Sequence, residues 1–199
     1  MRIGLLLASA LLAVSCDAPD QTPTAGDMDT VGTDTADREQ SPALQPVTAA
    51  TYIMQATMSD MYEIEAGQLA MTKGNSSSTR DFGKMMVDDH TASSRDLNAA
   101  IEQSNLRVTV PDELDAQHQE MIDRLQRDEG EAFDREYMRQ QMAAHNRALE
   151  LHRQFQQTGD DTNLQSYARN VLPVIEKHVD RLEQLGAPDP DTGAADMPG

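Results

Sequence analysis

The 199-residue chain has one cysteine, no tryptophan, four tyrosines and three phenylalanines. A lone cysteine excludes an internal disulfide, so no covalent cross-link holds the fold together. The sequence also lacks a glycine-rich phosphate loop, a nucleophile elbow and paired cysteines, and catalysis by a Ser/His/Asp triad has no local support. These absences favour a role that is not enzymatic.

Positive charge is scarce as well. The chain carries 16 Lys and Arg residues against 34 Asp and Glu residues, a formal net charge of −18. Such a surface repels phosphate backbones, which excludes nucleic acid as a partner. It also repels anionic lipid headgroups, so any contact with a membrane should run through a covalent lipid anchor.

The sequence has no apolar run long enough to span a bilayer, which takes about 20 residues. The apolar run over residues 3–14 follows Arg2 and has the length of a signal-peptide core. It leads into Ala13-Val14-Ser15-Cys16, which resembles the bacterial lipobox. We therefore expect residues 1–15 to be a lipoprotein signal peptide and Cys16 to be lipidated. The protein would then be anchored in the cell envelope and face the periplasm, with inner and outer membrane both open.

The alternative at this position is ordinary secretory cleavage near residues 8–10 or 13–15, which would leave Cys16 as a free thiol. We favour lipidation, because a solitary exposed thiol is a liability in an oxidising compartment.

Composition divides the mature chain into three parts. Residues 16–49 are rich in Asp, Thr, Ala, Pro and Gly, with almost no large apolar side chain. They cannot bury enough surface to offset the entropy of ordering, so we interpret them as a disordered acidic tether from Cys16. Residues 186–199 have the same character and are interpreted as a disordered tail. Residues 50–185 remain as one domain.

That domain is predicted to be all-α. Turn and capping signals divide it into long helices over residues 51–73, 78–104, 131–158 and 162–185. A shorter helix is expected to start at Thr109, Pro111 and Asp112 and to reach Gly130. Four long helices joined by short turns predict an antiparallel four-helix bundle with one short accessory helix.

Apolar spacing indicates which side of each long helix is buried. The expected interior positions are Met54, Met58, Met61, Glu65 and Gln68; Phe82, Met86, His90, Ser93 and Leu97; Met138, Met142, His145, Leu149 and His152, beside Tyr137, Gln141, Ala144, Ala148, Leu151 and Phe155; and Leu164, Ala168, Val171, Ile175, His178, Leu182 and Leu185. The methionines are interpreted as core filler, with a Cu(I)-binding stripe as the alternative. His118 and His152 are expected to be structural or solvated, with His152 near the periphery.

One ionisable residue falls near the middle of each long helix. These residues are Glu65, His90, His145 and His178, with Asp89 as an additional candidate. Buried together they are costly unless they satisfy one another or bind a cation. We therefore predict that they bind one divalent transition metal, Zn, Fe, Cu or Mn. The alternative is a metal-free hydrogen-bond network that fixes helix register.

The ordered motifs resemble a known bacterial family, the domain of unknown function 4142 family. They are Glu63-x-Glu65-x-Gly67-x-Leu69-Ala70, Phe82-Gly83-x-x-Met86-Val87-x-Asp89-His90, Phe133-Asp134-x-x-Tyr137, Gln141-x-x-x-His145 and Leu172-Pro173-x-x-x-x-His178. The resemblance implies a ferritin-like four-helix bundle that is often exported, and it implies no reaction.

The sequence departs from the di-iron ferritins at the residues that would hold iron. Those proteins carry Glu-x-x-His on two helices, whereas Val87, Met142 and Ile175 precede the three histidines here. A His-rich mononuclear site fits these residues better. The second hypothesis is a non-catalytic envelope module that binds an unidentified partner protein or has a structural role.

Overall fold

The computed structural model describes residues 46–188, and every element of regular structure within them is a helix. None of these helices is both long enough and apolar enough to cross a bilayer. The predicted signal peptide, Cys16, the tether up to residue 45 and the tail from residue 189 lie outside the described residues. The helices are α1 (Ala49–Lys73), α2 (Ser77–Ser104), α3 (Ala116–Arg127), α4 (Gly130–Thr158) and α5 (Thr162–Gln184).

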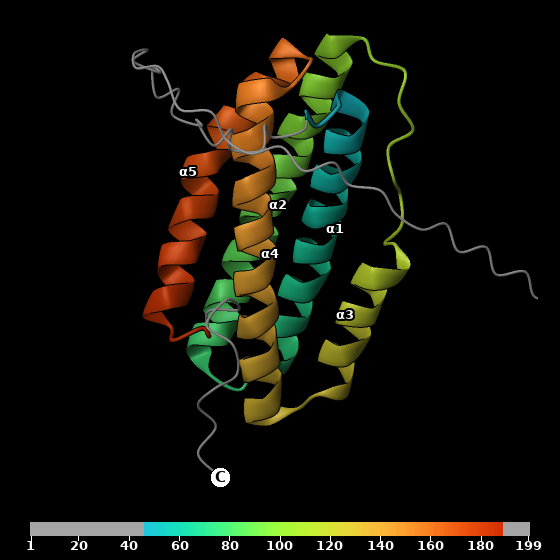
Figure 1. Ribbon diagram of the computed structural model, residues 1–199. Coiled ribbons are helices and arrows are strands. Elements are labelled where there is room, and N and C mark those ends of the chain that lie inside the picture. The colour runs from blue at the N-terminus through green and yellow to red at the C-terminus, as the bar shows by residue number, and fades with distance from the viewer. Residues whose placement is uncertain (1–45, 189–199) are drawn as a thin grey trace, which may run out of the picture. The chain divides into compact units, whose positions relative to one another are not determined.

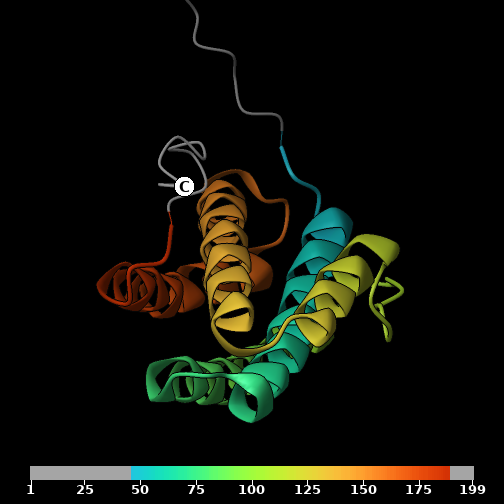
Figure 2. The same cartoon turned by 90° about the horizontal axis from the view of Figure 1, so that it is seen from below.

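The four long helices form an antiparallel bundle (Figure 1). The turns over residues 74–76 and 159–161 are too short to do more than reverse the chain, so α1 lies against α2 and α4 against α5. The bundle closes where α2 contacts α5 and α1 contacts α4. In Figure 2, α3 lies outside this ring, beside α1. The prediction of an all-α four-helix bundle with one accessory helix is confirmed.

The start of the accessory helix was predicted too early. It begins at Ala116, where the Asp115 side chain accepts the backbone N–H of His118 and caps the helix. The preceding segment is not helical. Its alternate residues Leu106, Val108 and Val110 pack against the core, and this period of two is the pattern of an extended chain.

The core consists of two hydrophobic clusters with a polar layer between them. One cluster includes Phe82, Phe133 and Leu182, and the other includes Tyr52, Phe155 and Leu164. The middle turns of α1, α2, α4 and α5 pass between these clusters and carry the buried polar side chains Asp60, Glu63, His90, His145 and His178.

The pairing of α1 with α2 is unusually close. A Cβ on Gly67 would lie 2.8 Å from the backbone oxygen of Gly83, and a Cβ on Gly83 would lie 2.7 Å from the Cβ of Ala70. Such backbone proximity requires glycine at both positions. It draws the polar residues of α1 toward those of α2.

Candidate metal centre

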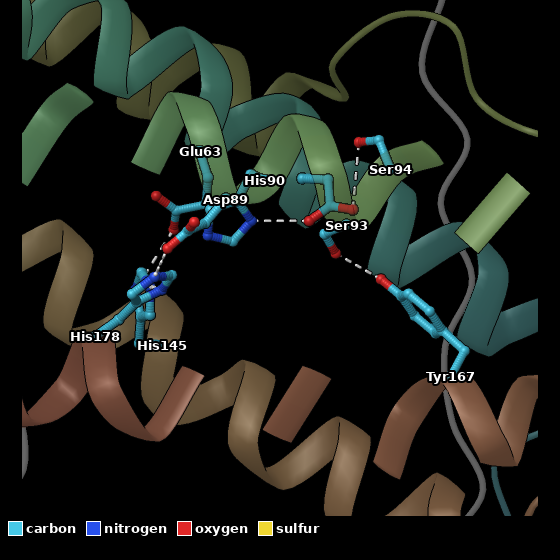
Figure 3. Close-up of polar contacts among 9 residues, drawn as sticks. Glu63, Asp89, His90, Ser93, Ser94, His145, Tyr167 and His178 are labelled. Atoms are coloured by element: carbon cyan, nitrogen blue, oxygen red, sulfur yellow. Dashed lines mark hydrogen bonds and ion pairs between the residues drawn. The ribbon is translucent and has the colours of Figure 1, made fainter. Parts of the chain in front are cut away.

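Three histidines from three helices meet in the polar layer. His90 comes from α2, His145 from α4 and His178 from α5, and all three are buried. One ring nitrogen of each lies within 4.8 Å of those of the other two. Figure 3 shows His145 and His178 reaching from α4 and α5 toward His90 and Asp89 on α2. The structure thus brings together all three histidines predicted from the sequence.

The second ring nitrogen of each histidine faces an acceptor outside the cluster. His90 Nδ1 lies 2.8 Å from the Asp60 carboxylate, and His178 Nε2 lies 2.9 Å from the Asp89 carboxylate. His145 Nδ1 lies 2.9 Å from the backbone oxygen of Gln141. A carbonyl or carboxylate accepts only, so each of these outer nitrogens must carry the proton. In the neutral rings the remaining nitrogens, His90 Nε2, His145 Nε2 and His178 Nδ1, are left with lone pairs.

The hydrogen-bond chain through His145 and His178 has one proton fewer than it has links. A chain of three links runs from the Gln141 carbonyl through His145 and His178 to Asp89, and the middle link joins His145 Nε2 to His178 Nδ1 at 3.1 Å. Two neutral imidazoles carry two protons, and the outer links use both. The middle link is then two lone pairs facing each other. A cation between them removes this repulsion, and that cation is either a third proton or a metal ion.

Burial disfavours the third proton at this link. It lowers the pKa of His145 well below its ordinary value, with the neighbouring His90 and His178 acting in the same direction. It also lowers the pKa of His178 to about 4, although the hydrogen bond to Asp89 opposes the shift. Both imidazoles are therefore neutral near pH 7.

His90 is the ring that attracts positive charge. Burial lowers its pKa, but the hydrogen bond to Asp60 and the charges of Asp60, Glu63 and Asp89 outweigh burial, so its pKa is raised overall. Its Nε2 is fully buried and has no hydrogen-bond partner among the described residues. A buried polar atom of this kind needs an explanation. The local potential favours a cation at that nitrogen.

Glu63 is a buried carboxyl group beside the cluster. It is 1 % exposed, and neither of its oxygens has a hydrogen-bond partner among the described residues. Its Oε1 lies 3.8 Å from His145 Nδ1. Burial raises its pKa to about 7, against the lowering effect of His90. Glu63 thus lies where its negative charge would balance a cation bound by the histidines.

Glu65, the carboxylate predicted for this site, is not part of it. Glu65 is only half-buried, and the inward acids of α1 are Asp60 and Glu63. Two residues advance a helix by about 200°, so Glu63 and Glu65 point to nearly opposite sides. Of the methionines expected in the interior, Met58 is buried, whereas Met54 is 49 % exposed. Asp89 is at the site and contacts His178 through the ring nitrogen that faces away from the other histidines.

Asp60 and Glu63 were not predicted as site residues. Both lie on the face of α1 formed by its small side chains, which include Ala56, Ala66 and Gly67. Small residues spaced at three and four positions are the sequence signal that could have identified this face, because the backbone of α2 approaches there.

The two remaining histidines lie apart from the cluster. His118 is half-buried on α3 and pairs with Asp115 at 2.8 Å. His152 is 6 % exposed, so the expectation that it lies at the periphery was wrong. Its Nδ1 lies 2.8 Å from the Tyr52 hydroxyl, and burial lowers its pKa to about 4.

Fold and site together define a four-helix-bundle protein with a buried three-histidine cluster. The model of the family described as domain of unknown function (DUF4142) matches residues 33–185. The chain belongs to this family, which confirms the resemblance seen in the sequence. No curated protein sequence matches the chain.

Two solved structures share the fold. One is CopM in the Cu(II)-bound form, with a TM-score of 0.60 and 15 % identity over 71 % of this chain and 97 % of that chain. The other is CopM in the Cu(I)-bound form, with a TM-score of 0.58 and 14 % identity over 70 % of this chain and 95 % of that chain. At these identities the similarity establishes the helical-bundle fold.

Proposed function

We propose that this protein binds one transition-metal ion inside its helical bundle, through His90 Nε2, His145 Nε2 and His178 Nδ1. The observation that carries the proposal is the missing proton between His145 and His178. Their facing lone pairs lie 3.1 Å apart, and both imidazoles are neutral because burial lowers their pKa values. Neutral imidazole is the form of histidine that ligates transition metals, so a metal ion can take the place of the missing proton.

The surroundings of the three rings suit a metal ion. Ligating histidines in proteins commonly donate their other N–H to a carboxylate or a backbone carbonyl, which fixes tautomer and ring orientation. Asp60, Gln141 and Asp89 supply these acceptors here. Metal–nitrogen bonds of about 2.0–2.1 Å in a tetrahedron require nitrogens about 3.4 Å apart. The His145–His178 pair, at 3.1 Å, lies close to this spacing, and small shifts of the rings bring all three nitrogens, which lie within 4.8 Å of one another, to it.

Charge balance supports a divalent ion. Asp60 and Asp89 each contact a ligand ring, and Glu63 lies beside the same group. A doubly charged ion held by neutral imidazoles offsets the negative charges of Asp60 and Asp89.

Copper is the ion that we test first. Imidazole is a good ligand for copper, zinc and iron alike, so ligand type alone does not select one of them. The solved proteins that share the fold are described as Cu(II)-bound and Cu(I)-bound forms. That description belongs to CopM, and it supports copper here as a proposal.

The proposed location is the cell envelope. Cys16 would be acylated and would anchor the bundle to a membrane through the acidic tether, with the domain facing the periplasm. Mass spectrometry of the native protein should find an acylated cysteine 16 as the first residue. A mature chain that starts elsewhere, or an unmodified thiol, contradicts the anchor and leaves the metal proposal untouched.

The direct test is metal content. Protein stripped with a chelator, reloaded with Cu(II), Zn(II), Fe(II) or Mn(II) and desalted should retain about one ion per chain of the preferred metal. His178→Ala should reduce affinity by more than the roughly 10–100-fold that loss of an outer partner costs. His118→Ala is the matched control and should bind as the wild type does, because His118 lies on α3 away from the cluster.

Failure of this test has a defined meaning. If the protein retains none of these ions, the cluster is a protonated hydrogen-bond network that fixes helix register. The protein would then be a metal-free envelope module with a structural or partner-binding role.

A further inference from the structure

A cavity of about 420 Å³ adjoins the histidine cluster. His90 and His178 line it, whereas His145 does not. Other lining residues such as Asn170 and Val174 are exposed, so the cavity connects the surface with two of the three histidines. It therefore reaches the cluster from one side only.

Small side chains create this space. The four long helices all contribute to the walls, and five of the lining residues are alanines: Ala56, Ala92, Ala99, Ala100 and Ala148. Alanine keeps a helix intact while leaving the volume of a larger side chain empty. The walls also carry polar groups, namely His152 and the hydroxyls of Ser93 and Tyr167, which lie 2.7 Å apart.

The charge of the cavity is negative. Asp60, Asp89 and Asp96 line it, and none of the described residues in its walls is Lys or Arg. Arg95 pairs with Asp96 from outside the lining at 3.0 Å. Like charges brought together cost free energy, so these walls admit neutral molecules more readily than anions.

Three protein nitrogens do not complete the coordination of a metal ion. Structural sites with four protein ligands are closed, whereas sites with three keep a position for an exogenous ligand. Here His145 lies on the closed side, and His90 and His178 face the cavity. We infer that the cavity admits a small uncharged nitrogen- or oxygen-donor ligand to the fourth coordination position of the ion held by His90, His145 and His178. This inference rests on the proposed metal site and extends it from binding of the ion to binding of a further ligand on that ion.

The test uses the full-length protein loaded with one equivalent of Cu(II). Pyridine-3-carboxamide and pyridine-3-carboxylate have the same donor ring and nearly the same size but differ in charge. Each is titrated into the loaded protein while the visible and electron paramagnetic resonance spectra of the copper are recorded. Copper content after desalting shows that the probe binds to the site and does not strip the metal.

We expect a saturable spectral change with one molecule of the neutral probe per copper, and affinity about tenfold or more weaker for the anionic probe. Val174→Trp should weaken binding of the neutral probe about tenfold or more and retain copper, because indole fills the space next to His178. Met54→Trp is the matched control, since Met54 is a similarly exposed apolar residue outside the cavity. Asn170→Trp provides a second blocking variant if Val174→Trp does not fold.

The possible failures are distinguishable. If copper binds but the neutral probe leaves its spectrum unchanged, or both blocking variants bind the probe as Met54→Trp does, the cavity does not lead to the metal. If the anion binds as tightly as the neutral probe, the assigned ligand class is wrong. If the wild type retains none of Cu(II), Zn(II), Fe(II) and Mn(II), the metal site itself is refuted and this inference with it.

Discussion

His152 and the three-histidine cluster are both buried in this bundle, and His145 and His152 lie two turns apart on α4. The two regions differ in whether every hydrogen-bond link has a proton to donate. His152 and Tyr52 share one link, and two neutral groups always supply a donor for it. His145 and His178 share three links with Gln141 and Asp89 and carry only two protons. Burial is common to both places, and the missing proton marks only the cluster as a cation site.

The largest effect expected from this difference is stabilisation by metal. An ion that binds only the folded protein raises the free energy of unfolding by about 4 kcal/mol at a free concentration a thousand times its Kd. Thermal denaturation with and without Cu(II), in the presence of a weak competing chelator, measures it. His145→Ala should abolish the gain, whereas His152→Gln should keep it. Equal loss in both variants would mean that the two places are not distinct.

The second effect is the pH dependence that His152 contributes to the stability of the metal-free protein. The pKa of His152 is about 4 in the folded protein and near 6.5 in the unfolded chain. The unfolded chain therefore binds more protons between these values, and stability falls as pH drops from 6.5 to 4. The full shift corresponds to about 3 kcal/mol.

Urea denaturation at several pH values measures this slope. His152→Gln keeps a polar partner for Tyr52 and does not titrate, so its stability should fall less over the same range. Glu63, whose pKa is raised, contributes in the opposite direction. Its contribution is the same in both proteins, so it drops out of the difference between wild type and variant. Parallel slopes for wild type and variant would show that His152 is not buried in its neutral form.

The fold was predictable because the residues that begin and end each helix, and the amphipathic spacing within it, are local features of the sequence. In α5 the buried residues Leu164, Ala168, Ile175, His178 and Leu182 follow the pattern read from the sequence. In α1 the same procedure found the buried Met58, but it also selected Met54, which is 49 % exposed, and missed Asp60 and Glu63. That helix packs against α2, α3 and α4. Its closest contact, with α2, is made by small residues and not by the most hydrophobic ones.

The site was predictable in part for the same reason. His90, His145 and His178 stood out as single polar residues on otherwise apolar faces. Asp60 did not, because its role depends on a hydrogen bond to His90 across two helices. The proton shortage depends on distances between α2, α4 and α5, which no single-helix pattern contains.

A third prediction tests whether the outer carboxylate matters to the cluster. Asp60→Asn keeps an oxygen that can accept the N–H of His90 but removes the negative charge that favours a cation there. Metal affinity should fall about 10–100-fold with the fold intact, as measured by calorimetric competition with a chelator. Asp96→Asn makes the same charge change at an exposed residue without contact to a histidine, and it should have much less effect. Equal losses would point to a general charge effect.

The smallest expected effect comes from the corresponding change at His152. Tyr52→Phe removes the hydroxyl that pairs with His152 Nδ1 and keeps the ring stacked on Phe155, whose centroid lies 3.9 Å away. Loss of this hydrogen bond should lower the free energy of unfolding by about 1 kcal/mol, near the lower end for a buried group. The cost is small because His152 lines the cavity, where water can replace the hydroxyl. Chemical denaturation should show this loss while metal affinity stays at the wild-type value. A tenfold loss of metal affinity would instead mean that Tyr52 and His152 help to set the geometry of the cluster, and the two histidine sites would have to be treated as one connected polar network.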